Sequence, residues 1–544
     1  MKRFHVYMSL LLQVLFLCSC EENLAIPQVK QQTYLEVSLP QTHTRTMLSE
    51  GDSDSYSMLW NEGDRITVNG ILSDPLEAGK AGGTSAVFAF RDSLTAPYEV
   101  RVGEWLASDV ARVSSMQVLH GAEGTVRVPM YGCADRNETV RLKHVAAIVR
   151  VPLLDDGSQR VISHVCLRSS ASDPVSGSVL IPSGKEEARI ELIDRQNVIC
   201  HTPGSECRLS VVQERFLDIP ILPGTCTNGL DATIVASDGQ TMHIHLLSGV
   251  KVTAGSVYLC PRTVFEPHES ASLVISDAAS LASFRNRVES GENTLSAVLV
   301  SDVVVESGCW DTPLNLFQGT FDGGGHTVSG LKCPMFNELR GVVRNLRLDS
   351  QIEVQLPAQA DTMWTAILAQ RLSAGGGNNA HIGSVSNCSV SGYLKVVNTS
   401  TAKENCNVGG IVGYMVRGKV VGCENLAEIS VTARESTRRL NVGGIIGRAY
   451  SGGSVLTIDS CVSKGCVSVG GTPAVYNVGG LIGESASNSG TDAPNIISNC
   501  LSLTAPAVEA EPVSAGSRSG EIAGNTSNPL VNCHFRSSPW VCLL

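Results

Sequence analysis

The sequence predicts a mainly β protein, in which two tandem β-sandwiches are followed by a parallel β-solenoid, or β-helix, with a capping helix. Three observations support this class. A glycine-containing phrase recurs in the last third of the chain, short alternating apolar runs fill the first half, and one stretch between them has helical spacing. The 52 glycines, with only 5% aromatic and 17% charged residues, also suit extended β architecture better than a helical bundle.

The first half of the chain is predicted to form two sandwiches, at residues 33–155 and 156–265. A chain of 544 residues is too long for one hydrophobic core, so several domains are expected. Clusters of Gly, Pro, Asn and Asp separate the apolar runs at spacings typical of β-sandwiches. Clear runs are residues 33–39, 86–90, 145–151, 230–237 and 252–259.

Residues 276–291, within a linker at 266–294, carry the clearest helix signal. Asp277 or the serine before it can cap the start, and Gly291 can end the helix. The residues that share one apolar face are Leu281, Phe284 and Val288. We expect this helix to cover the first coil of the solenoid, because an uncapped end exposes edge strands and apolar core. A helix that binds a partner is the less favoured alternative.

The repeated phrase is Asn-Val-Gly-Gly-Ile/Leu-Val/Ile-Gly. Its three clear copies begin at Asn407, Asn441 and Asn477, which lie 34 and 36 residues apart. Self-similarity at such a period is typical of solenoids. Valine and isoleucine favour extended backbone, whereas each glycine would weaken a helix by about 1 kcal/mol. One unit cannot cover its own apolar face but a stack can, so residues 295–544 are predicted to form the solenoid.

Two sets of repeat residues are predicted to have structural roles. The glycines of the phrase should let neighbouring layers approach closely. They are Gly409, Gly410, Gly413, Gly443, Gly444, Gly447, Gly479, Gly480 and Gly483. A cysteine follows each copy, and weaker outer copies extend the series to Cys388, Cys423, Cys461, Cys500 and Cys533. We expect these cysteines to stack as buried thiols that act as small hydrophobic groups.

Other cysteines could form disulfides, which are common in exported chains. Candidates for pairing are Cys200, Cys207, Cys226 and Cys260. The sequence does not decide which of them pair.

The N-terminus has the features of a signal peptide, with two basic residues, an apolar stretch at 6–17 and a cysteine at its end. Its last residues, Leu17-Cys18-Ser19-Cys20, resemble the bacterial lipobox, which implies that Cys20 is lipidated, for example with palmitate. Residues 21–32 would be a polar tether, and their acidic start is similar to the surface-export signal of Bacteroidetes lipoproteins. A surface-exposed outer-membrane lipoprotein is therefore expected. An ordinary secretory peptide is the alternative.

Two resemblances to known families follow from these motifs. Fragments of residues 33–265 resemble the fimbrillins of Bacteroidetes, the type V pilins: Thr44-Arg45-Thr46, Trp60 with Gly63-Asp64-Arg65-Ile66, and residues 128–131, 142–147, 219–224 and 254–258. The glycine phrase with its following cysteine resembles the GLUG motif of bacterial surface adhesins, and residues 317–331 resemble the leader segment that precedes such repeats.

The fimbrillin resemblance implies a mode of assembly. In that family an arginine-specific protease removes the first strand, and a strand of another subunit fills the groove by β-augmentation. Arg45 stands where such a cut would fall, although it could also be a solvated loop residue. The implied partners are other fimbrial subunits through donor-strand exchange, the outer membrane through the lipid anchor, and a host or bacterial surface ligand, such as a glycan. Because a long solenoid follows, the chain suits a minor or tip subunit that accepts a strand without donating one.

The sequence therefore predicts a cell-surface adhesin rather than an enzyme. A net charge of −11 argues against a nucleic-acid partner, and we find no convincing catalytic set, metal site or cofactor motif. The run from Asp322 to His326 is expected to be a tight turn rather than a metal or phosphate loop. The alternatives are a monomeric surface glycan-binding lipoprotein and, less favoured, a β-helix polysaccharide lyase, because fold does not fix function.

Overall fold

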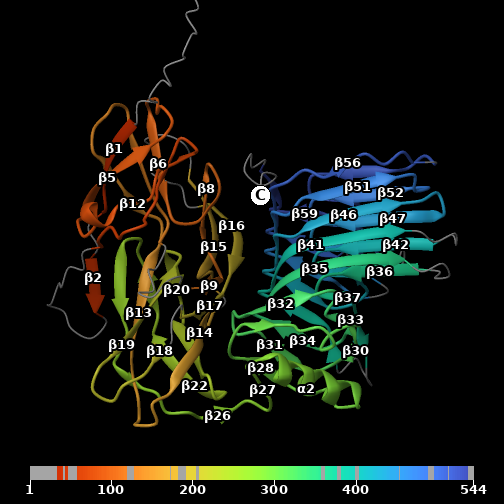
Figure 1. Cartoon of the computed structure of the whole chain (residues 1–544), viewed down its shortest axis with the longest axis horizontal. Coiled ribbons are helices and arrows are strands. Elements are labelled where there is room, and N and C mark those ends of the chain that lie inside the picture. Colours follow the sequence, from red (N-terminus) through yellow and green to blue (C-terminus); the bar gives the residue numbers. More distant parts are fainter. Residues whose placement is uncertain are drawn as a thin grey trace, which may run out of the picture.

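The predicted mainly β class is confirmed by the computed structural model, which has one α-helix and one 3-10 helix among the residues that it describes. Those residues are 33–40, 43–46, 58–118, 128–171, 173–181, 191–203, 207–356, 362–375, 381–398, 404–451, 454–487, 495–512 and 514–536. Two lobes lie side by side (Figure 1). We call residues 33–270 the N-terminal lobe and residues 274–536 the coil stack.

Two sheets and the short helix η1 (Ala78–Lys80) build the first part of the N-terminal lobe. The smaller sheet has the strand order β11 (Val140–Arg141), β1 (Thr33–Ser38) and β5 (Ser85–Phe90). The larger sheet has the order β12 (Lys143–His144), β10 (Met130–Ala134), β6 (Tyr98–Val102), β3 (Thr67–Val68) and β4 (Ile71–Leu72). Residues of both sheets share one hydrophobic core, in which Leu35, Trp60 and Phe88 are buried.

Four further sheets complete the N-terminal lobe. The first has the order β19 (Arg215–Ile221), β13 (Ala147–Leu154), β24 (Ser256–Leu259) and β2 (His43–Thr46), with β25 (Thr263–Val264) also beside β13. The second has the order β26 (Glu269–Ser270), β22 (Gln240–Leu247), β21 (Leu230–Ala236), β14 (Val161–Ser169), β17 (Val198–Thr202) and β9 (Met116–Val118), with β18 (Cys207–Arg208) also beside β14. The others are β16 (Glu191–Gln196), β15 (Ser176–Leu180), β8 (Val110–Val113) and β7 (Trp105–Ala107), and the pair β20 (Gly224–Cys226) and β23 (Val250–Val252).

Strand pairing crosses the expected domain boundary at residue 155. Strand β13 was expected in the first sandwich, yet it pairs with β19 and β24, and its residues Val149 and Val151 pack in the second hydrophobic core. Strands β2 and β9 also join sheets built mainly from later residues. Apolar alternation indicates that a strand is half-buried, but it does not say against which sheet the strand packs.

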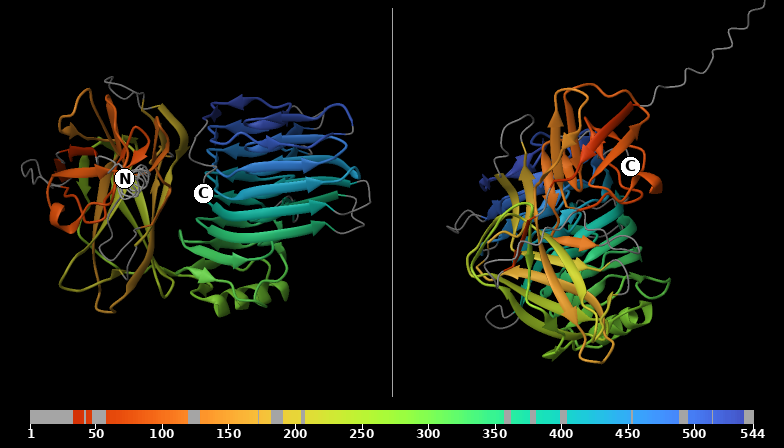
Figure 2. Two further views of the ribbon diagram at one scale, coloured as in Figure 1. Left: turned by 45° about the horizontal axis from the view of Figure 1, so that its top comes forward. Right: turned by 90° about the vertical axis from the view of Figure 1, so that its left-hand side faces the viewer.

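Four parallel sheets run through the coil stack, the arrangement expected of a β-solenoid (Figure 2). Sheet I contains β27 (Val274–Ile275), β28 (Ala297–Leu299), β31 (Thr320–Asp322), β34 (Val342–Arg344), β40 (Ser384–Ser386), β44 (Lys419–Val421), β49 (Thr457–Asp459), β54 (Ile496–Ser498) and β59 (Leu530–Val531). Sheet II contains β29 (Val303–Val304), β32 (Thr327–Leu331), β35 (Arg347–Leu356), β41 (Ser389–Asn398), β45 (Glu424–Asn425), β50 (Val462–Ser463), β55 (Leu501–Ser502), β60 (His534–Phe535), β46 (Glu428–Ala433), β51 (Val467–Gly471) and β56 (Ala507–Val508).

Sheets III and IV complete each coil. Sheet III contains β30 (Leu314–Phe317), β33 (Phe336–Leu339), β37 (Ala369–Leu372), β43 (Val412–Met415), β48 (Ile446–Ser451), β53 (Ile482–Ser487) and β58 (Ala523–Thr526). Sheet IV contains β36 (Thr362–Ala366), β42 (Glu404–Gly409), β47 (Thr437–Gly443), β52 (Tyr476–Gly479) and β57 (Arg518–Gly520). A small antiparallel pair, β38 (Ala374–Gly375) and β39 (His381–Ile382), lies beside them.

The repeated phrase links sheet IV to sheet III in each coil, and its copies lie in register. Val408 pairs with Val442, which pairs with Val478. The asparagine before each valine is buried and bonded to its own copy, because Asn441 Nδ2 donates to Asn407 Oδ1 at 2.7 Å and Asn477 Nδ2 donates to Asn441 Oδ1 at 2.8 Å. The phrase therefore supplies a hydrogen-bond ladder and a column of core valines.

The glycines of the phrase lie where the backbones of different coils meet. A methyl group added at Gly444 would overlap the carbonyl oxygen of Gly480 and the hydroxyl of Ser463. At Gly443 it would overlap backbone atoms of Ile446 and Gly483. Side chains larger than hydrogen would therefore push neighbouring coils apart.

The repeat cysteines lie at the corner between sheets I and II. All five are free thiols, and four of them are fully buried, with Cys533 half-buried. Burial raises the pKa of Cys423 and Cys461 above the ordinary thiol value. Each cysteine follows a residue whose positive φ turns the chain between the two sheets, as at Asn387 (φ 51°) and Ser460 (φ 55°).

The helix α2 (Ala278–Glu289) covers the first coil, as predicted (Figure 1). Asp277 caps it by accepting a hydrogen bond from the amide of Ser280, and the Ser280 hydroxyl oxygen accepts one from the amide of Asp277, which completes a capping box. Phe284 is fully buried against Phe317 and Phe321, with ring centroids 5.5 and 5.3 Å apart. The helix thus closes the apolar interior at this end of the stack.

We expect Gly444→Ala to destabilise the coil stack by about 1 to 3 kcal/mol, because the added methyl group has no room between coils. Gly470→Ala is the matched control, since Gly470 lies in β51 of the same stack and a methyl group there would meet no atom within 4 Å. Thermal unfolding followed by circular dichroism measures both variants. Equal melting temperatures would contradict the close-approach role of Gly444.

Candidate functional site

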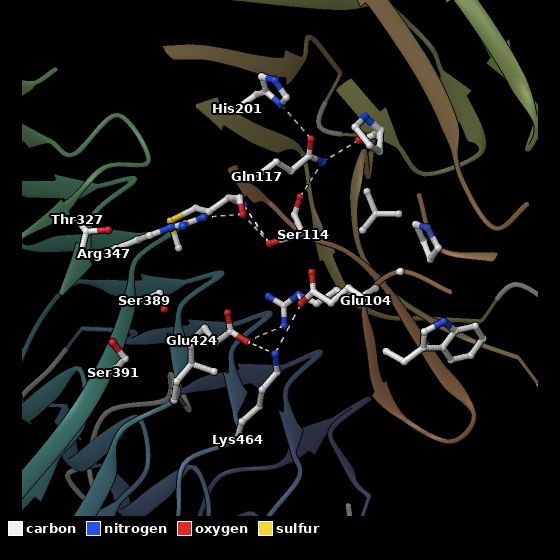
Figure 3. Close-up of a pocket in the computed structure, with 18 of the residues that line it drawn as sticks. Glu104, Ser114, Gln117, His201, Thr327, Arg347, Ser389, Ser391, Glu424 and Lys464 are labelled. Atoms are coloured by element: carbon white, nitrogen blue, oxygen red, sulfur yellow. Dashed lines mark hydrogen bonds and ion pairs between the residues drawn. The ribbon is translucent and has the colours of Figure 1, made fainter. Parts of the chain in front are cut away.

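A cavity of about 740 Å³ lies between the N-terminal lobe and the coil stack (Figure 3). The lobe lines it with residues around β7 to β9 and with His201 of β17. The stack lines it with sheet II residues, including Arg347 of β35 and Glu424 of β45. Charged, amide and aromatic side chains all contribute, so the cleft offers mixed polar and apolar contacts.

Four charged side chains join the two lobes on one side of the cleft. Arg112 Nη1 donates to Glu424 Oε1 at 3.0 Å, and Lys464 Nζ lies 2.7 Å from the same oxygen. Glu104 Oε1 lies 3.7 Å from both Arg112 Nε and Lys464 Nζ. In Figure 3, Glu424 and Lys464 face Glu104 across the cleft.

This pairing fixes the charge state of the cluster. Burial by itself would raise the pKa of Glu424, but Arg112 and Lys464 lower it to about 2. Burial also works against the charge of Arg112, yet Glu424, Asp194 and Glu104 together raise its pKa above the ordinary value. The carboxylate and the guanidinium are therefore both charged at neutral pH.

Neutral polar groups occupy the other side of the cleft. Gln117 Nε2 donates to the carbonyl oxygens of Pro220 at 2.8 Å and Ser114 at 3.0 Å, which holds its amide in place. The Nδ1 atom of His201 lies 3.4 Å from Gln117 Oε1, and burial lowers the pKa of His201 to about 4. Arg347 Nη2 donates to the carbonyl oxygen of Met116 at 2.8 Å, a further bond between the lobes.

The arrangement favours binding and lobe docking over proton transfer. A polysaccharide lyase needs a carboxylate or another base that accepts a proton near neutral pH. The cleft does bring Glu424 together with Arg112 and Lys464, but these cations stabilise the charged carboxylate instead. Within the described ranges, no group of three or more His, Cys, Asp or Glu side chains is placed to hold a metal ion. No helix among the described residues is long and apolar enough to span a membrane.

The corner between sheets I and II is the ridge that docks on the N-terminal lobe. Ser115 Oγ donates to Asn387 Oδ1 at 2.6 Å. On the following coils, Gln196 Nε2 donates to the carbonyl oxygen of Gly422 at 3.3 Å, and Ser460 Oγ donates to that of Arg195 at 2.8 Å. The sequence carried a signal for this ridge, because Asn and Gly before the repeat cysteines are residues that accept positive φ.

A second candidate surface is a row of sheet III side chains, which we call the arginine–aromatic row; its members are half-buried, except Glu484, which is buried. Its members pair in register along the stack: Glu338, Arg371, Tyr414, Arg448, Glu484 and Asn525. The Tyr414 ring stacks on Trp364 with centroids 5.5 Å apart, and the Arg448 guanidinium lies 4.9 Å from the Tyr450 ring centroid. Arg448 Nε also lies 2.6 Å from Glu484 Oε2.

The residues singled out from the sequence occupy different places. Cys20 lies outside the described residues. Arg45 lies in β2, paired with Tyr258 of β24, so its backbone is part of a strand rather than a loop. The nine repeat glycines and five repeat cysteines lie in the coil stack, and none lines the cleft. The cysteines whose pairing the sequence left open are free, buried thiols: Cys200, Cys207, Cys226 and Cys260. The turn expected between Asp322 and His326 is confirmed, with Gly324 and Gly325 at positive φ.

Comparison with known proteins gives distant likenesses. No protein-family model matches the chain, and no curated protein matches it. A structure of a candidate immunoglobulin A1 protease from Bacteroides ovatus is 17% identical, with a TM-score of 0.30, over 49% of this chain and 87% of that chain. A candidate cell adhesion protein from Bacteroides ovatus is 11% identical, with a TM-score of 0.26, over 43% and 93%. A fimbrial assembly protein from Parabacteroides distasonis is 8% identical, with a TM-score of 0.14, over 39% and 99%. Likenesses this distant carry no weight for the function of this chain.

We expect Glu424→Gln to lower the stability of the full chain at pH 7 by about 3 kcal/mol, because Arg112 would lose a buried partner. The folded pKa of Glu424, about 2, lies below the ordinary value of 4.5. The contribution of the Glu424 carboxylate to the free energy of unfolding is therefore present above about pH 4.5 and is lost as pH falls toward 2. Urea unfolding at pH 7 and at pH 3 should show a smaller difference between variant and wild type at the lower pH.

Glu138→Gln serves as the control for this measurement, because the Arg136–Glu138 pair is exposed. It should change stability by less than about 1 kcal/mol at either pH. A Glu424→Gln variant that behaves like Glu138→Gln would show that the cleft cluster does not hold the lobes together.

Proposed function

We propose that this chain is a cell-surface adhesin that binds an extracellular ligand through the arginine–aromatic row of the coil stack. The row itself is the observation that carries the proposal. It places guanidinium groups beside the rings of Trp364, Tyr414 and Tyr450 on one face. Aromatic faces and arginine together offer stacking, cation–π contacts and hydrogen-bond donors, which suit a glycan with ring faces and polar edges.

The stacking of the coils supports polyvalent binding by this face. Because the coils pair in register, members of the row repeat at about 4.8 Å along the stack. The asparagine ladder and the buried valine column of the adjoining sheet IV keep successive coils in register. Individually shallow contacts on several coils can add up when the ligand itself has repeated units. A surface polysaccharide or a glycosylated host protein has that form.

The position of β1 supports assembly by strand complementation, which the fimbrillin resemblance implies. Strand β1 lies between β5, in antiparallel pairing, and β11, in parallel pairing. Its Leu35 and Val37 are 1% and 0% exposed in the core of the first sandwich. Removal of the segment up to Arg45 would leave unpaired backbone on both neighbours and an empty apolar slot, which a strand of another subunit could fill.

The proposed setting follows from these two features. A lipid on Cys20 would hold the precursor at the outer membrane with its coil stack outside the cell. After cleavage, the chain would join a type V fimbria as a minor or tip subunit that accepts a donor strand. A monomeric glycan-binding lipoprotein would use the same row but would keep β1 in place.

Binding to arrays of glycans and of extracellular-matrix proteins tests the adhesin proposal. The full mature chain should bind at least one class of ligand, and the double variant Arg371→Ala, Tyr450→Ala should weaken that binding at least roughly 10-fold, about 1.4 kcal/mol. Lys395→Ala is the matched control, because Lys395 is exposed on sheet II of the same stack. Equal loss in the control, or no ligand for the wild type, would refute the role of the row.

Peptide exchange tests strand complementation. Limited digestion with an arginine-specific protease should cut after Arg45 and leave the rest of the lobe folded. The cut chain should then take up a fluorescent synthetic peptide of residues 33–45 in a 1:1 ratio, because the slot between β5 and β11 can be refilled. Arg45→Lys keeps the charge but resists the protease, so it should take up no peptide. Unfolding after the cut, or a cut chain that excludes the peptide, would contradict this mode of assembly.

A further inference from the structure

Cys166 and Cys200 face each other across neighbouring antiparallel strands of the N-terminal lobe. They pair directly in the register of β14 with β17, and their Sγ atoms lie 2.7 Å apart. The amide of Cys200 donates away from this partner, to the carbonyl oxygen of Ser115 at 2.6 Å on the other side of β17. A residue's N–H and C=O point to the same side of a strand, so Cys166 and Cys200 form a non-hydrogen-bonded pair.

This type of pair has a geometry suited to a disulfide. In non-hydrogen-bonded antiparallel pairs the Cα atoms are about 4.5 Å apart and the side chains project from the same face. Disulfides span Cα separations from about 4.4 to 6.8 Å. Two thiols that face each other there need no movement of the backbone to join.

The pair also lies at the contact between the two lobes. Asn345 Nδ2, from the corner ridge of the coil stack, lies 3.7 Å from Cys166 Sγ. A methyl group at Gly325, in the turn after β31, would lie 3.6 Å from Cys200 Sγ. Next to it, Thr202 Oγ1 donates to the carbonyl oxygen of Gly324 at 3.2 Å. The position of β17 relative to β14 therefore sets the surface on which the turn of the coil stack docks.

We propose that Cys166 and Cys200 form a cross-strand disulfide in the exported protein and that this bond fixes the docking surface for the coil stack. The oxidant is a disulfide-bearing thiol oxidoreductase of the cell envelope, or oxidised glutathione in vitro. The Cys166 thiolate attacks the oxidant's disulfide and gives a mixed disulfide with loss of one thiol. The Cys200 thiolate then attacks the Cys166 sulfur and releases the second thiol. The two cysteines lose two protons and two electrons, which the oxidant accepts.

The exposure of the two sulfurs gives the order of these steps. Cys166 is half-buried and Cys200 is buried, so an external oxidant reaches Cys166 first. Burial, together with the neighbouring Cys166, raises the pKa of Cys200 above its ordinary value, which disfavours its attack on an external disulfide. In the cell, oxidation requires the proposed export, because export brings the chain to the oxidant. The bond itself can be tested on the purified chain.

Peptide mapping of the purified full chain tests the proposal. After equilibration with oxidised glutathione and alkylation of free thiols under denaturing conditions, digestion without reduction should yield one peptide pair that links Cys166 to Cys200. The linked pair should disappear in Cys166→Ser and in Cys200→Ser. It should remain in Cys260→Ser, a buried cysteine of the same lobe. Full alkylation of Cys166 and Cys200 after oxidation, or linkage of either to another cysteine, would overturn the proposal.

Melting temperatures give a second measurement, which can be made on the wild type even if one of the variants does not fold. The oxidised wild type should melt roughly 5 to 10 °C above the reduced wild type, because the bond closes the loop between the two cysteines in the unfolded chain. Cys166→Ser should melt at the same temperature under both conditions. A redox-independent melting temperature in the wild type would refute the bond even if Cys200→Ser does not fold. Binding to the array ligand is scored separately, so loss of the disulfide and loss of adhesion are distinguishable.

Discussion

In-register parallel stacking is the constraint on which the coil stack depends. When one coil lies on the next, each side chain meets its own equivalent, so every position must tolerate a copy of itself. Asparagine satisfies this rule by donating to asparagine, valine by packing on valine, and glycine by leaving room for backbone. Like charges cannot stack in this way. The arginine–aromatic row accordingly changes residue type from Arg371 to Tyr414 to Arg448 to Glu484.

The corner between sheets I and II connects this constraint to the N-terminal lobe. A positive φ before each repeat cysteine turns the chain sharply, places the cysteine inside the coil and leaves the corner residue on its outer side. The outside positions bond to Ser115, Arg195 and Gln196 of the lobe. The repeat motif therefore builds the interior and the docking ridge with the same two residues, and the cleft with Glu424 opens directly beside them.

The local sequence pattern predicted which segments form strands and the helix better than it predicted which strands pair with one another. The helix with its Asp277 cap and the in-register valines followed from spacing, because these signals lie within one element or one repeat. The pairing of β13 did not follow, since alternation reports burial but not the sheet that provides it. The cleft could not be predicted either. Its central pair joins Arg112 to Glu424, residues 312 positions apart, and no local signal ties an isolated Arg to an isolated Glu at that separation.

The docking ridge also determines where such a protein can grow. Duplicating one repeat in the gene would insert one extra layer and shift every later corner by about 4.8 Å. Inserted between Asn387 and Ser460, that layer would pull the later corners away from their partners on the lobe. Added after Leu503, it would leave these contacts in place, together with the apolar cluster that Leu501 and Leu503 form with Leu106 and Val110 of the lobe, and it would displace a 4.0 Å ion pair between Arg536 and Asp109. The coil stack can therefore change in length at its C-terminal end, whereas the number of coils that contact the N-terminal lobe is fixed.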